Sequence, residues 1–254
     1  MELMQVIQAI QPLCEESMQA AAGRLQGLAI PLGSLGKLGE AVVRLAGIQR
    51  TLIPEIDRRA VVVFCADNGV VAQGVTQCGQ EVTAAVTQNM DAGKSAVCLV
   101  AAQLGIDVVP VDIGVANEVQ GGRIVCRKLM RGTDDFTKGP AMTRETCIRA
   151  IETGMEMALM CVQSGHKLLC AGEMGIGNTT SAAAVSAVLL GLPPERVTGR
   201  GAGLSSEGLA RKTEAVRRAV AKNRPDPADP VDILSKVGGL DLAGMAGLYL
   251  GGAF

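Results

Sequence analysis

A glycine-rich run from Gly172 to Thr180, GEMGIGNTT, holds the residue types and spacing best suited to chemistry. It follows a short apolar segment at 167–171 and precedes an Ala/Val/Leu-rich segment at 181–190. This order predicts a strand, a glycine loop and a helix. Backbone N–H groups and the positive end of the helix dipole would then meet at one point, which favours an anion such as phosphate. A plain tight turn between a strand and a helix is the alternative.

The spacing within this loop limits the kind of phosphate that it could bind. Gly172 and Gly177 have the spacing of a Walker A motif, but Asn178 stands where that motif requires lysine. A triphosphate would lack its usual contact, so a monophosphate or another small anion fits better, and a P-loop protein is disfavoured. A dinucleotide fingerprint is weaker too, because Thr180 replaces its third glycine.

Charged residues near this loop add two further candidates for chemistry. Glu173 is a carboxylate inside the loop that could accept a hydrogen bond from a substrate hydroxyl or base nitrogen, and it should point away from an anion. The segment 196–224 has six more Lys and Arg residues than Glu, which is typical of a solvated helix face. Either Arg211 or Lys212 could nevertheless return to the same site and pair with phosphate. The sole histidine, His166, lies between a helical pattern and a strand, so we expect a connector there and no catalytic triad.

The elements that must position these residues alternate between strands and helices. This pattern predicts an α/β fold with a doubly wound, mostly parallel sheet flanked by helices. We expect strands at 60–66, 107–112 and 167–171, and a short one at Val197 before a glycine loop that ends at Gly203. Ligands of such sheets bind at the carboxyl ends of the strands. The predicted site is therefore the edge shared by the loops at 67–69, 112, 172–180 and 199–203.

The helices are predicted from apolar periodicity and capping residues. We expect an amphipathic helix within 1–30, a second one after the glycine-rich loop at 31–39, and one helix from Glu81 to Leu104 that ends at Gly105. Thr143 is predicted to cap a helix that runs to Ser164, and Ser205 or Ser206 to cap the next one. We divide the chain into a helical N-terminal subdomain, 1–50, and an α/β nucleotide-binding domain, 51–254.

Composition excludes several classes of function. The chain has 254 residues, a net charge of −1, 2% aromatic residues and no Trp, so it lacks both the charge and the stacking platform of a nucleic-acid binder. Its eight cysteines form no C-x-x-C pair and have one histidine among them, which predicts no metal site and no cofactor. No signal peptide and no membrane span is predicted, and we expect a cytoplasmic protein with reduced thiols.

Eight stretches together resemble a known family, the nicotinate-nucleotide–dimethylbenzimidazole phosphoribosyltransferases, which make the lower-ligand nucleotide of cobalamin. They run in family order over nearly the whole chain, and the ordered set is highly specific. The stretches are PLGSLGKLGE (31–40), VVVFCADNGVVAQGV (61–75), VTAAVTQNM (82–90), VVPVDIGV (108–115), RGTDDFTKGPAMTRE (131–145), GEMGIGNTTSAAA (172–184), VTGRGAGLSSEGLARK (197–212) and GGLDLAGMAGLYLGGA (238–253).

The resemblance implies a glycosyl transfer between two small molecules. Nicotinate mononucleotide supplies its ribose 5-phosphate, a benzimidazole nitrogen attacks C1 of the ribose with inversion, and nicotinate leaves. Positive charge should develop on the ribose in the transition state. The enzyme must align the reactants and take a proton from the benzimidazole. The family is usually dimeric, so a homodimer is implied.

The resemblance also implies a site for each part of the substrates. The 5′-phosphate would bind the loop, Lys212 would contact it in preference to Arg211, and Glu173 would face the ribose or base as a candidate catalytic group. Cys78 and Val86 would line the benzimidazole pocket, and Asp241 would border the site. The loop residues implied for the phosphate are Gly175, Gly177, Asn178, Thr179 and Thr180, and Gly201 and Gly203 would lie along the nucleotide.

Two departures from the family pattern bear on activity. Asn68 stands where the family usually has histidine, and a neutral amide cannot act as a base. Family members also continue past the motif at 238–253 with a segment that carries the general-base glutamate, and we expect this chain to be truncated. The alternative function is therefore a catalytically impaired module that binds nucleotide or benzimidazole. Loss of a general base would slow the reaction by about 10²–10⁴-fold.

Overall fold

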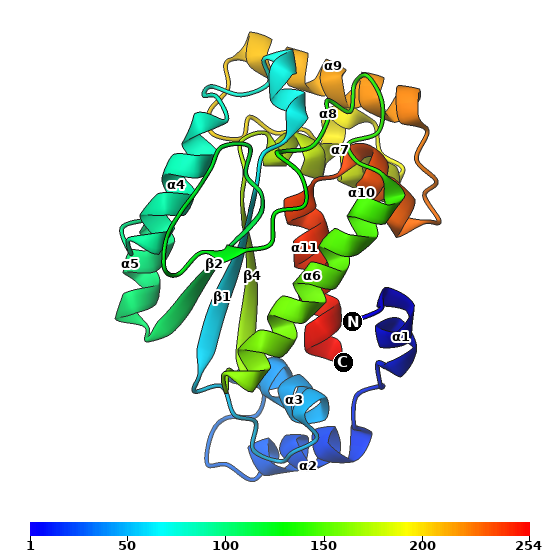
Figure 1. Cartoon of the computed structure of the whole chain (residues 1–254). Helices are drawn as coiled ribbons and strands as arrows, with labels where there is room; N and C mark the ends of the chain where they lie inside the picture. Colours follow the sequence, from blue (N-terminus) through cyan, green and yellow to red (C-terminus); the bar gives the residue numbers. More distant parts are fainter.

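A four-stranded parallel sheet forms the centre of the computed structural model, which describes residues 1–254 (Figure 1). The strand order is β3-β2-β1-β4, and every neighbouring pair is parallel. The strands are β1 (Arg59–Ala66), β2 (Ile106–Gly114), β3 (Val125–Cys126) and β4 (Leu168–Met174). The predicted α/β class with a parallel sheet flanked by helices is confirmed.

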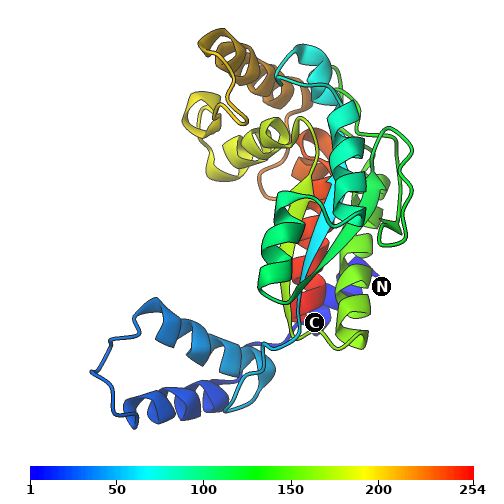
Figure 2. The ribbon, with the colours of Figure 1, turned by 90° about the vertical axis from the view of Figure 1, so that its left-hand side faces the viewer.

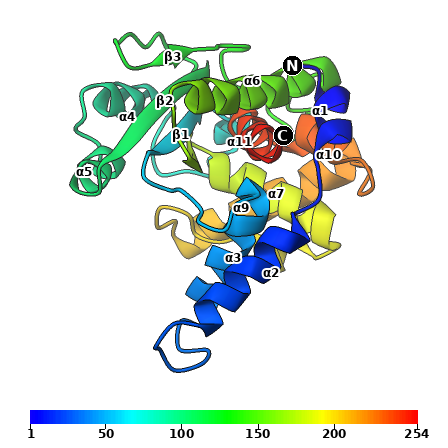
Figure 3. The same ribbon diagram turned by 90° about the horizontal axis from the view of Figure 1, so that it is seen from below.

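Helices cover both faces of the sheet because β1 alternates its side chains between two cores. Val62 and Phe64 pack in the larger core with α6 (Arg144–Gln163) and α11 (Leu240–Ala253). Val63 and Cys65 point to the other face and pack in a smaller core with α4 (Glu81–Asp91) and α5 (Ala96–Gln103). Seen from below, α4 and α5 lie on the opposite side of the sheet from α11 (Figure 3). This two-sided burial agrees with the near-continuous apolar sequence of β1.

Helices α6 and α11 pack backbone against backbone, and this contact fixes where α11 begins. A Cβ atom on Gly247 of α11 would lie 1.8 Å from the Ile151 carbonyl of α6, and one on Gly154 would lie 2.0 Å from the Gly244 carbonyl. A Cβ on Gly244 would also lie 2.5 Å from Cδ1 of Phe64. Only glycine permits this approach. The first turn of α11, with Asp241, is thereby held at the carboxyl end of β1.

The remaining elements complete the two ends of the sheet. The 3₁₀ helix η1 (Gly69–Gln73) follows β1, while α7 (Asn178–Leu190), α8 (Pro194–Val197), α9 (Ser206–Asn223) and α10 (Pro230–Val237) follow β4. Near the N-terminus, α1 (Leu3–Ala9) packs with its Leu3 and Val6 in the larger core. By contrast, α2 (Glu15–Gln26) and α3 (Lys37–Gln49) pair with each other and project away from the body (Figure 2). The division at residue 50 stays a prediction, although α1 lies on the α/β body.

Several predicted element boundaries were wrong for identifiable reasons. The single helix within 1–30 is broken between α1 and α2, where Pro12 lacks an N–H donor. The helix 81–104 is two helices, because Gly93 adopts a φ of 72° and Ser95 begins α5 by accepting from the Cys98 N–H. No strand forms at Val197, since Pro194 starts the helix α8 there. Strand β4 continues past Ala171 to Met174.

The predicted caps at three helix ends are confirmed. The Thr143 hydroxyl accepts from the Thr146 N–H at 3.1 Å, and the Ser205 hydroxyl accepts from the Gly208 N–H at 3.1 Å. Gly105 follows α5 with a φ of 61°, as a helix-ending glycine should. Among these helices, none combines the length and apolar character needed to cross a bilayer.

Candidate functional site

Asn68 joins three segments at the carboxyl edge of the sheet. It lies two residues after the end of β1, and its side-chain Nδ2 donates to Asp241 Oδ2 at the start of α11 over 3.3 Å. Its Oδ1 accepts from the Ser181 hydroxyl of α7 at 2.6 Å. Its backbone N–H donates to the carbonyl of Ile176 at 3.3 Å. The loops after β1 and β4 and the first turn of α11 therefore form one buried polar unit.

Two glycines of the loop after β4 are required by this close approach. A Cβ on Gly175 would lie 1.9 Å from the Ala66 carbonyl, so any side chain there would collide with β1. Gly177 is the N-cap of α7 with a φ of 96°, and a Cβ there would lie 3.0 Å from Cβ of Asn68. The predicted strand, glycine loop and helix are thus present, and the N-terminus of α7 opens at this edge.

Lys212 reaches the N-terminus of α7 from the next long helix, α9. Its Nζ donates to the Thr179 hydroxyl at 2.7 Å and to the Gly199 carbonyl at 3.1 Å. The residue is 1% exposed, and burial lowers the pKa of its ammonium. It takes part in no salt bridge. Because burying a charge without a counter-ion is costly, this lysine favours an anion at the loop.

Arg211 does not share this position. It is exposed, and its Nε donates to the Gly74 carbonyl at 3.3 Å, on the side of η1. Neighbouring residues on a helix point about 100° apart, so only one of the two can face α7. The structure brings Lys212 to the loop and leaves Arg211 outside it.

The polar residues at the start of α7 point in different directions. Asn178 turns back, since its Oδ1 accepts from the Thr179 N–H at 2.6 Å while its Nδ2 donates to Glu173. Thr179 is exposed beside Lys212. Thr180 is fully buried, and its hydroxyl has no hydrogen-bond partner. Its side chain therefore lies inside the fold, and its backbone N–H donates to the Gly177 carbonyl at 2.9 Å. The structure thus does not place Thr180 in contact with a ligand as predicted.

Two carboxylates without a basic partner lie on the other side of the unit. Asp241 is fully buried, and burial together with the nearby charge of Glu173 raises the pKa of Asp241 to about 7. Burial also raises the pKa of Glu173, against the opposing hydrogen bond from Asn178. Glu173 lies within β4, paired in register with Phe64, and not in the loop as predicted. These carboxylates favour a positively charged group next to them.

The glycine loop at 199–203 also lies at this edge, although no strand precedes it. A Cβ on Gly201 would lie 3.0 Å from the Thr179 hydroxyl and 3.4 Å from Nζ of Lys212. The carbonyl of Gly203 accepts from Nε2 of Gln77 at 2.5 Å. Helices α8 and α9 therefore bring this loop to the site in place of the expected strand.

The predicted base-side residues come from the segment before α4 and from α4 itself. Cys78 is exposed next to Gln77, and its carbonyl accepts from the Thr76 hydroxyl at 2.9 Å. Val86 is half-buried and packs against the smaller core, as does Met174 at the end of β4. The thiol is thus accessible near the loop, whereas Val86 is partly covered by the core.

Sequence reasoning did not identify Ser181 or Gln77, and it noted Asn68 only as a departure from the family. The position of Asn68 in the short polar segment after a buried strand was the available signal for a role at the edge. Ser181 lies within an apolar helix and Gln77 within an irregular segment, so neither had a local signal.

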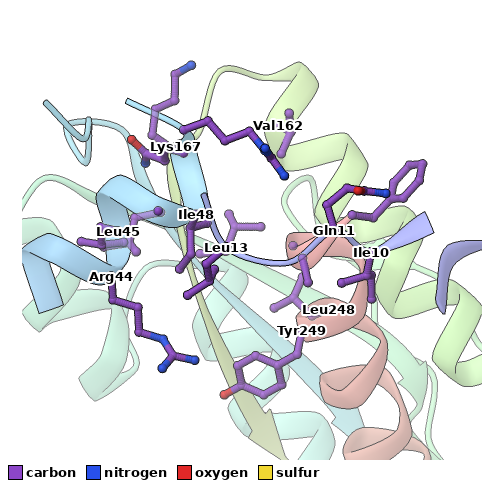
Figure 4. Close-up of a pocket in the computed structure, with 18 of the residues that line it drawn as sticks. Ile10, Gln11, Leu13, Arg44, Leu45, Ile48, Val162, Lys167, Leu248 and Tyr249 are labelled. Carbon is purple, nitrogen blue, oxygen red and sulfur yellow. The ribbon is translucent and has the colours of Figure 1, made fainter. Parts of the chain in front are cut away.

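A cavity of about 720 Å³ lies at the opposite end of the sheet (Figure 4). Leu45 and Ile48 of α3, together with Leu248 and Tyr249 of α11, contribute to its lining. None of the predicted site residues lines it, and its lining includes no Asp or Glu side chain. Its volume alone is weaker evidence of chemistry than buried, unpaired charges are. We therefore assign the chemistry to the carboxyl edge.

His166 lies beside this cavity and connects three elements. Its Nδ1 is 3.0 Å from the Cys161 carbonyl of α6, and its Nε2 is 2.9 Å from Oδ2 of Asp107 on β2. Both partners are acceptors, so the ring serves as the predicted connector. It lies at the end of the sheet away from Lys212.

Comparison with known proteins assigns this arrangement to a family. A family model described as phosphoribosyltransferase matches residues 10–254. The chain belongs to this phosphoribosyltransferase family. The curated nicotinate-nucleotide–dimethylbenzimidazole phosphoribosyltransferase of Acetivibrio thermocellus is 47% identical over 251 residues, which are 99% of this chain and 72% of that protein. The protein of the same name from Ruminiclostridium cellulolyticum is 45% identical over 98% of this chain and 71% of its own length.

Solved structures agree with the phosphoribosyltransferase assignment. The crystal structure of CobT from Thermus thermophilus superposes with a TM-score of 0.88 at 44% identity. The match covers 92% of this chain and 70% of that one. A second crystal structure from the same organism, which carries the phosphoribosyltransferase name, has a TM-score of 0.86 at 43% identity. The fold of this phosphoribosyltransferase is therefore shared over nearly all of its residues.

Proposed function

We propose that the protein transfers the 5-phosphoribosyl group of nicotinate mononucleotide to 5,6-dimethylbenzimidazole, giving α-ribazole 5′-phosphate and nicotinate. The observation that carries the proposal is the buried Lys212, which has no carboxylate partner and lies at the N-terminus of α7. The names of the similar proteins supply the substrate class. The sheet edge supplies one place for an anion and another for a cation.

The 5′-phosphate would bind between the loop and Lys212. The positive end of the α7 dipole and the lysine ammonium would both face the anion. The Thr179 N–H would join them once it leaves the Asn178 side chain, to which it donates at 2.6 Å. The N–H groups of Asn178 and Thr180 already donate to the carbonyls of Gly175 and Gly177. A phosphate beside Lys212 would provide the counter-charge that the buried ammonium lacks. A monophosphate suits this site better than a triphosphate, because only one lysine reaches it.

The carboxylates of Glu173 and Asp241 would stabilise the positive charge that the substrate carries during the reaction. The nicotinate ring of the donor is a pyridinium, and charge passes to the ribose carbon as the C1–N bond breaks. The electron pair of that bond leaves with nicotinate, while a benzimidazole nitrogen forms the new bond to C1. Glu173 and Asp241 lack basic partners, so they can stabilise this charge electrostatically.

One proton must leave the benzimidazole after its other nitrogen has attacked. We assign Glu173 as the base that accepts this proton. Its side chain is half-buried and accepts a hydrogen bond from Nδ2 of Asn178. Its raised pKa makes it a stronger base than an exposed glutamate. The benzimidazole would lie toward Cys78 and Val86, and the ribose toward Gly201 and Gly203.

A product assay tests the proposal directly. The purified 254-residue protein is incubated with nicotinate mononucleotide and 5,6-dimethylbenzimidazole, and α-ribazole 5′-phosphate and nicotinate are quantified by mass spectrometry. We expect both products in equal amounts and a loss of about 10²–10⁴-fold in Glu173→Gln. Glu145→Gln, at an exposed position on α6, is the matched control. Nucleotide binding without product would support the binding-only alternative, and no binding would refute both functions.

A homodimer and a cytoplasmic location are further parts of the proposal. Exposed apolar side chains on the α2–α3 arm support self-association, among them Leu32 at 85% and Leu38 at 63% exposure. All eight cysteines are free, which supports a reducing compartment. Sedimentation velocity at several concentrations would test the first part, and a monomer throughout would contradict it.

A further inference from the structure

The loop at 199–203 covers Lys212 while remaining exposed itself. Each of its five residues is exposed, whereas the lysine beneath it is 1% exposed. The position of a Cβ on Gly201 is 3.4 Å from the lysine Nζ, so the backbone passes directly over the ammonium. A phosphate can contact Lys212 only if this loop admits it, and the position of the loop therefore controls the anion site.

Two hydrogen bonds attach this exposed loop to α9 and to the segment before α4. Lys212 donates to the Gly199 carbonyl at 3.1 Å, at one end of the loop. Gln77 donates to the Gly203 carbonyl at 2.5 Å, at the other end. The Arg200 side chain bonds only the following residues, with Nη1 donating to the Leu204 carbonyl at 2.7 Å. A bound phosphate would compete with Gly199 for Lys212. It would leave the hydrogen bond between Gln77 and Gly203 in place.

We propose that Gln77 is a positioning residue for the phosphoribosyl donor. By holding Gly203, it keeps the loop over Lys212 and fixes the distance between the phosphate and the segment that carries Cys78. This inference rests on the proposed function, because it assigns the donor to this edge. Gln77 touches neither the reacting atoms nor the phosphate and acts through the loop backbone.

The expected effect follows from what the hydrogen bond does. When nucleotide binds, Lys212 shifts part of its hydrogen bonding from Gly199 to the phosphate, and the Gln77 contact then carries more of the attachment of the loop to the body. Removing it should accelerate nucleotide release and leave the bond-breaking step unchanged. One hydrogen bond of this kind corresponds to about a five- to tenfold change in affinity. The expected pattern is therefore a raised KM with little change in kcat.

The absence of tryptophan from the chain provides a direct readout of the loop. Ala202 is exposed at the middle of the loop, so Ala202→Trp introduces a single indole whose emission reports the position of the loop. In this background, stopped-flow release of nicotinate mononucleotide is measured with and without Gln77→Ala. We expect release to be about five- to tenfold faster with Gln77→Ala and the melting temperature to fall by no more than about 4 °C.

Variants separate positioning from general damage. Gln77→Glu keeps the size of the side chain but removes its N–H donor, and it should match Gln77→Ala. Gln103→Ala, at an exposed position that ends α5, should behave as the parent protein. Equal release rates and KM in the parent, Gln77→Ala and Gln77→Glu would overturn this proposal alone. A melting temperature that falls by more than about 4 °C, with kcat and KM both altered, would also overturn it, because it would indicate a structural role. A parent protein that binds no nucleotide would instead refute the proposed function.

Discussion

The two ends of the central sheet differ in the kind of group that they bury. The carboxyl end buries charged side chains, whereas the amino end surrounds an apolar cavity. At the carboxyl end, Lys212 and Asp241 are buried without an oppositely charged partner, and Gly175 leaves no room for a side chain. At the amino end, a cavity of about 720 Å³ is lined mainly by apolar residues, and no Asp or Glu side chain lines it. An unpaired buried charge costs free energy that a ligand of opposite charge would recover, whereas an apolar hollow calls for no charged ligand. The electrostatic cost of buried, unpaired charge therefore identifies this site better than cavity volume does.

Two lysines show the same difference between a paired and an unpaired charge. Lys128 lies 3.3 Å from Oδ2 of the buried Asp112, and this pair stabilises the loop after β2. Lys212 bonds a hydroxyl and a carbonyl instead. The first lysine is satisfied within the fold. The second lacks a negative partner, which the proposed nucleotide would supply.

The largest expected effect comes from filling the contact at the carboxyl end. Gly175→Ala would place a Cβ 1.9 Å from the Ala66 carbonyl, so β1 and the loop must separate. We expect a loss of about 3 kcal/mol or more in the free energy of unfolding, measured with urea. Gly252→Ala is the control in α11 at the amino end, where a Cβ meets nothing within 4 Å. It should be neutral or stabilising by about 0.5–1 kcal/mol, and equal losses in both variants would contradict the comparison.

The next effect concerns the unpaired charge. Lys212→Met should weaken binding of nicotinate mononucleotide by about 10- to 100-fold in calorimetric titration, because it removes a charge-assisted contact. The unliganded protein should keep its stability or gain some, since burial lowers the pKa of this lysine and disfavours its charged form. Lys222→Met, exposed on the same helix, is the control. Unchanged affinity in Lys212→Met would remove the lysine from the site.

A smaller effect should appear as a pH dependence of stability. Burial raises the pKa of Asp241 to about 7 from an ordinary value of 3.8. The protonated carboxyl is therefore favoured in the folded state, and its stabilisation is complete below pH 3.8 and lost as pH rises through 7. Relative to Asp241→Asn, the wild-type protein should lose about 1–3 kcal/mol of unfolding free energy between pH 4 and pH 8. Parallel pH curves for the two proteins would contradict this.

The smallest effects are expected at the amino end. Arg44→Ala and Tyr249→Ala alter the lining of the cavity, and Tyr249 is 64% exposed. Each should change the unfolding free energy by less than about 0.5 kcal/mol and nucleotide affinity by less than about twofold. Calorimetric titration and urea unfolding provide the measurements. A tenfold loss of nucleotide affinity in either variant would place part of the site at the cavity.

Sequence patterns predicted the core strands well because continuous apolar runs have few alternatives in an α/β chain. They missed the two-residue β3 and ended β4 too early at Ala171, since parallel pairing with β1 carries Glu173 into the strand despite its charge. They also predicted a strand at Val197, where Pro194 starts a helix instead. Tertiary pairing and proline geometry, which apolar runs do not record, decided these cases.

The sequence predicted which loops form the site. It did not predict which side chains of the neighbouring helices point into it. The glycine spacing and the following apolar helix identified the N-terminus of α7, but no local signal distinguished Lys212 from Arg211. That choice depends on how α9 is rotated against α7. Asn68 and Gln77 bond partners 173 and 126 residues away, so their roles follow only from the fold.

The most direct test is a thermodynamic cycle that removes the phosphate from the ligand, the charge of Lys212 from the protein, or both. Calorimetry compares nicotinate mononucleotide with its dephosphorylated riboside, on the wild-type protein and on Lys212→Met. We expect the wild-type protein to prefer the nucleotide by about 100-fold and the variant by less than about tenfold, because the lysine and the phosphate interact with each other. An unchanged preference in Lys212→Met would show that the phosphate binds elsewhere and would contradict the assignment of the carboxyl edge as the nucleotide site.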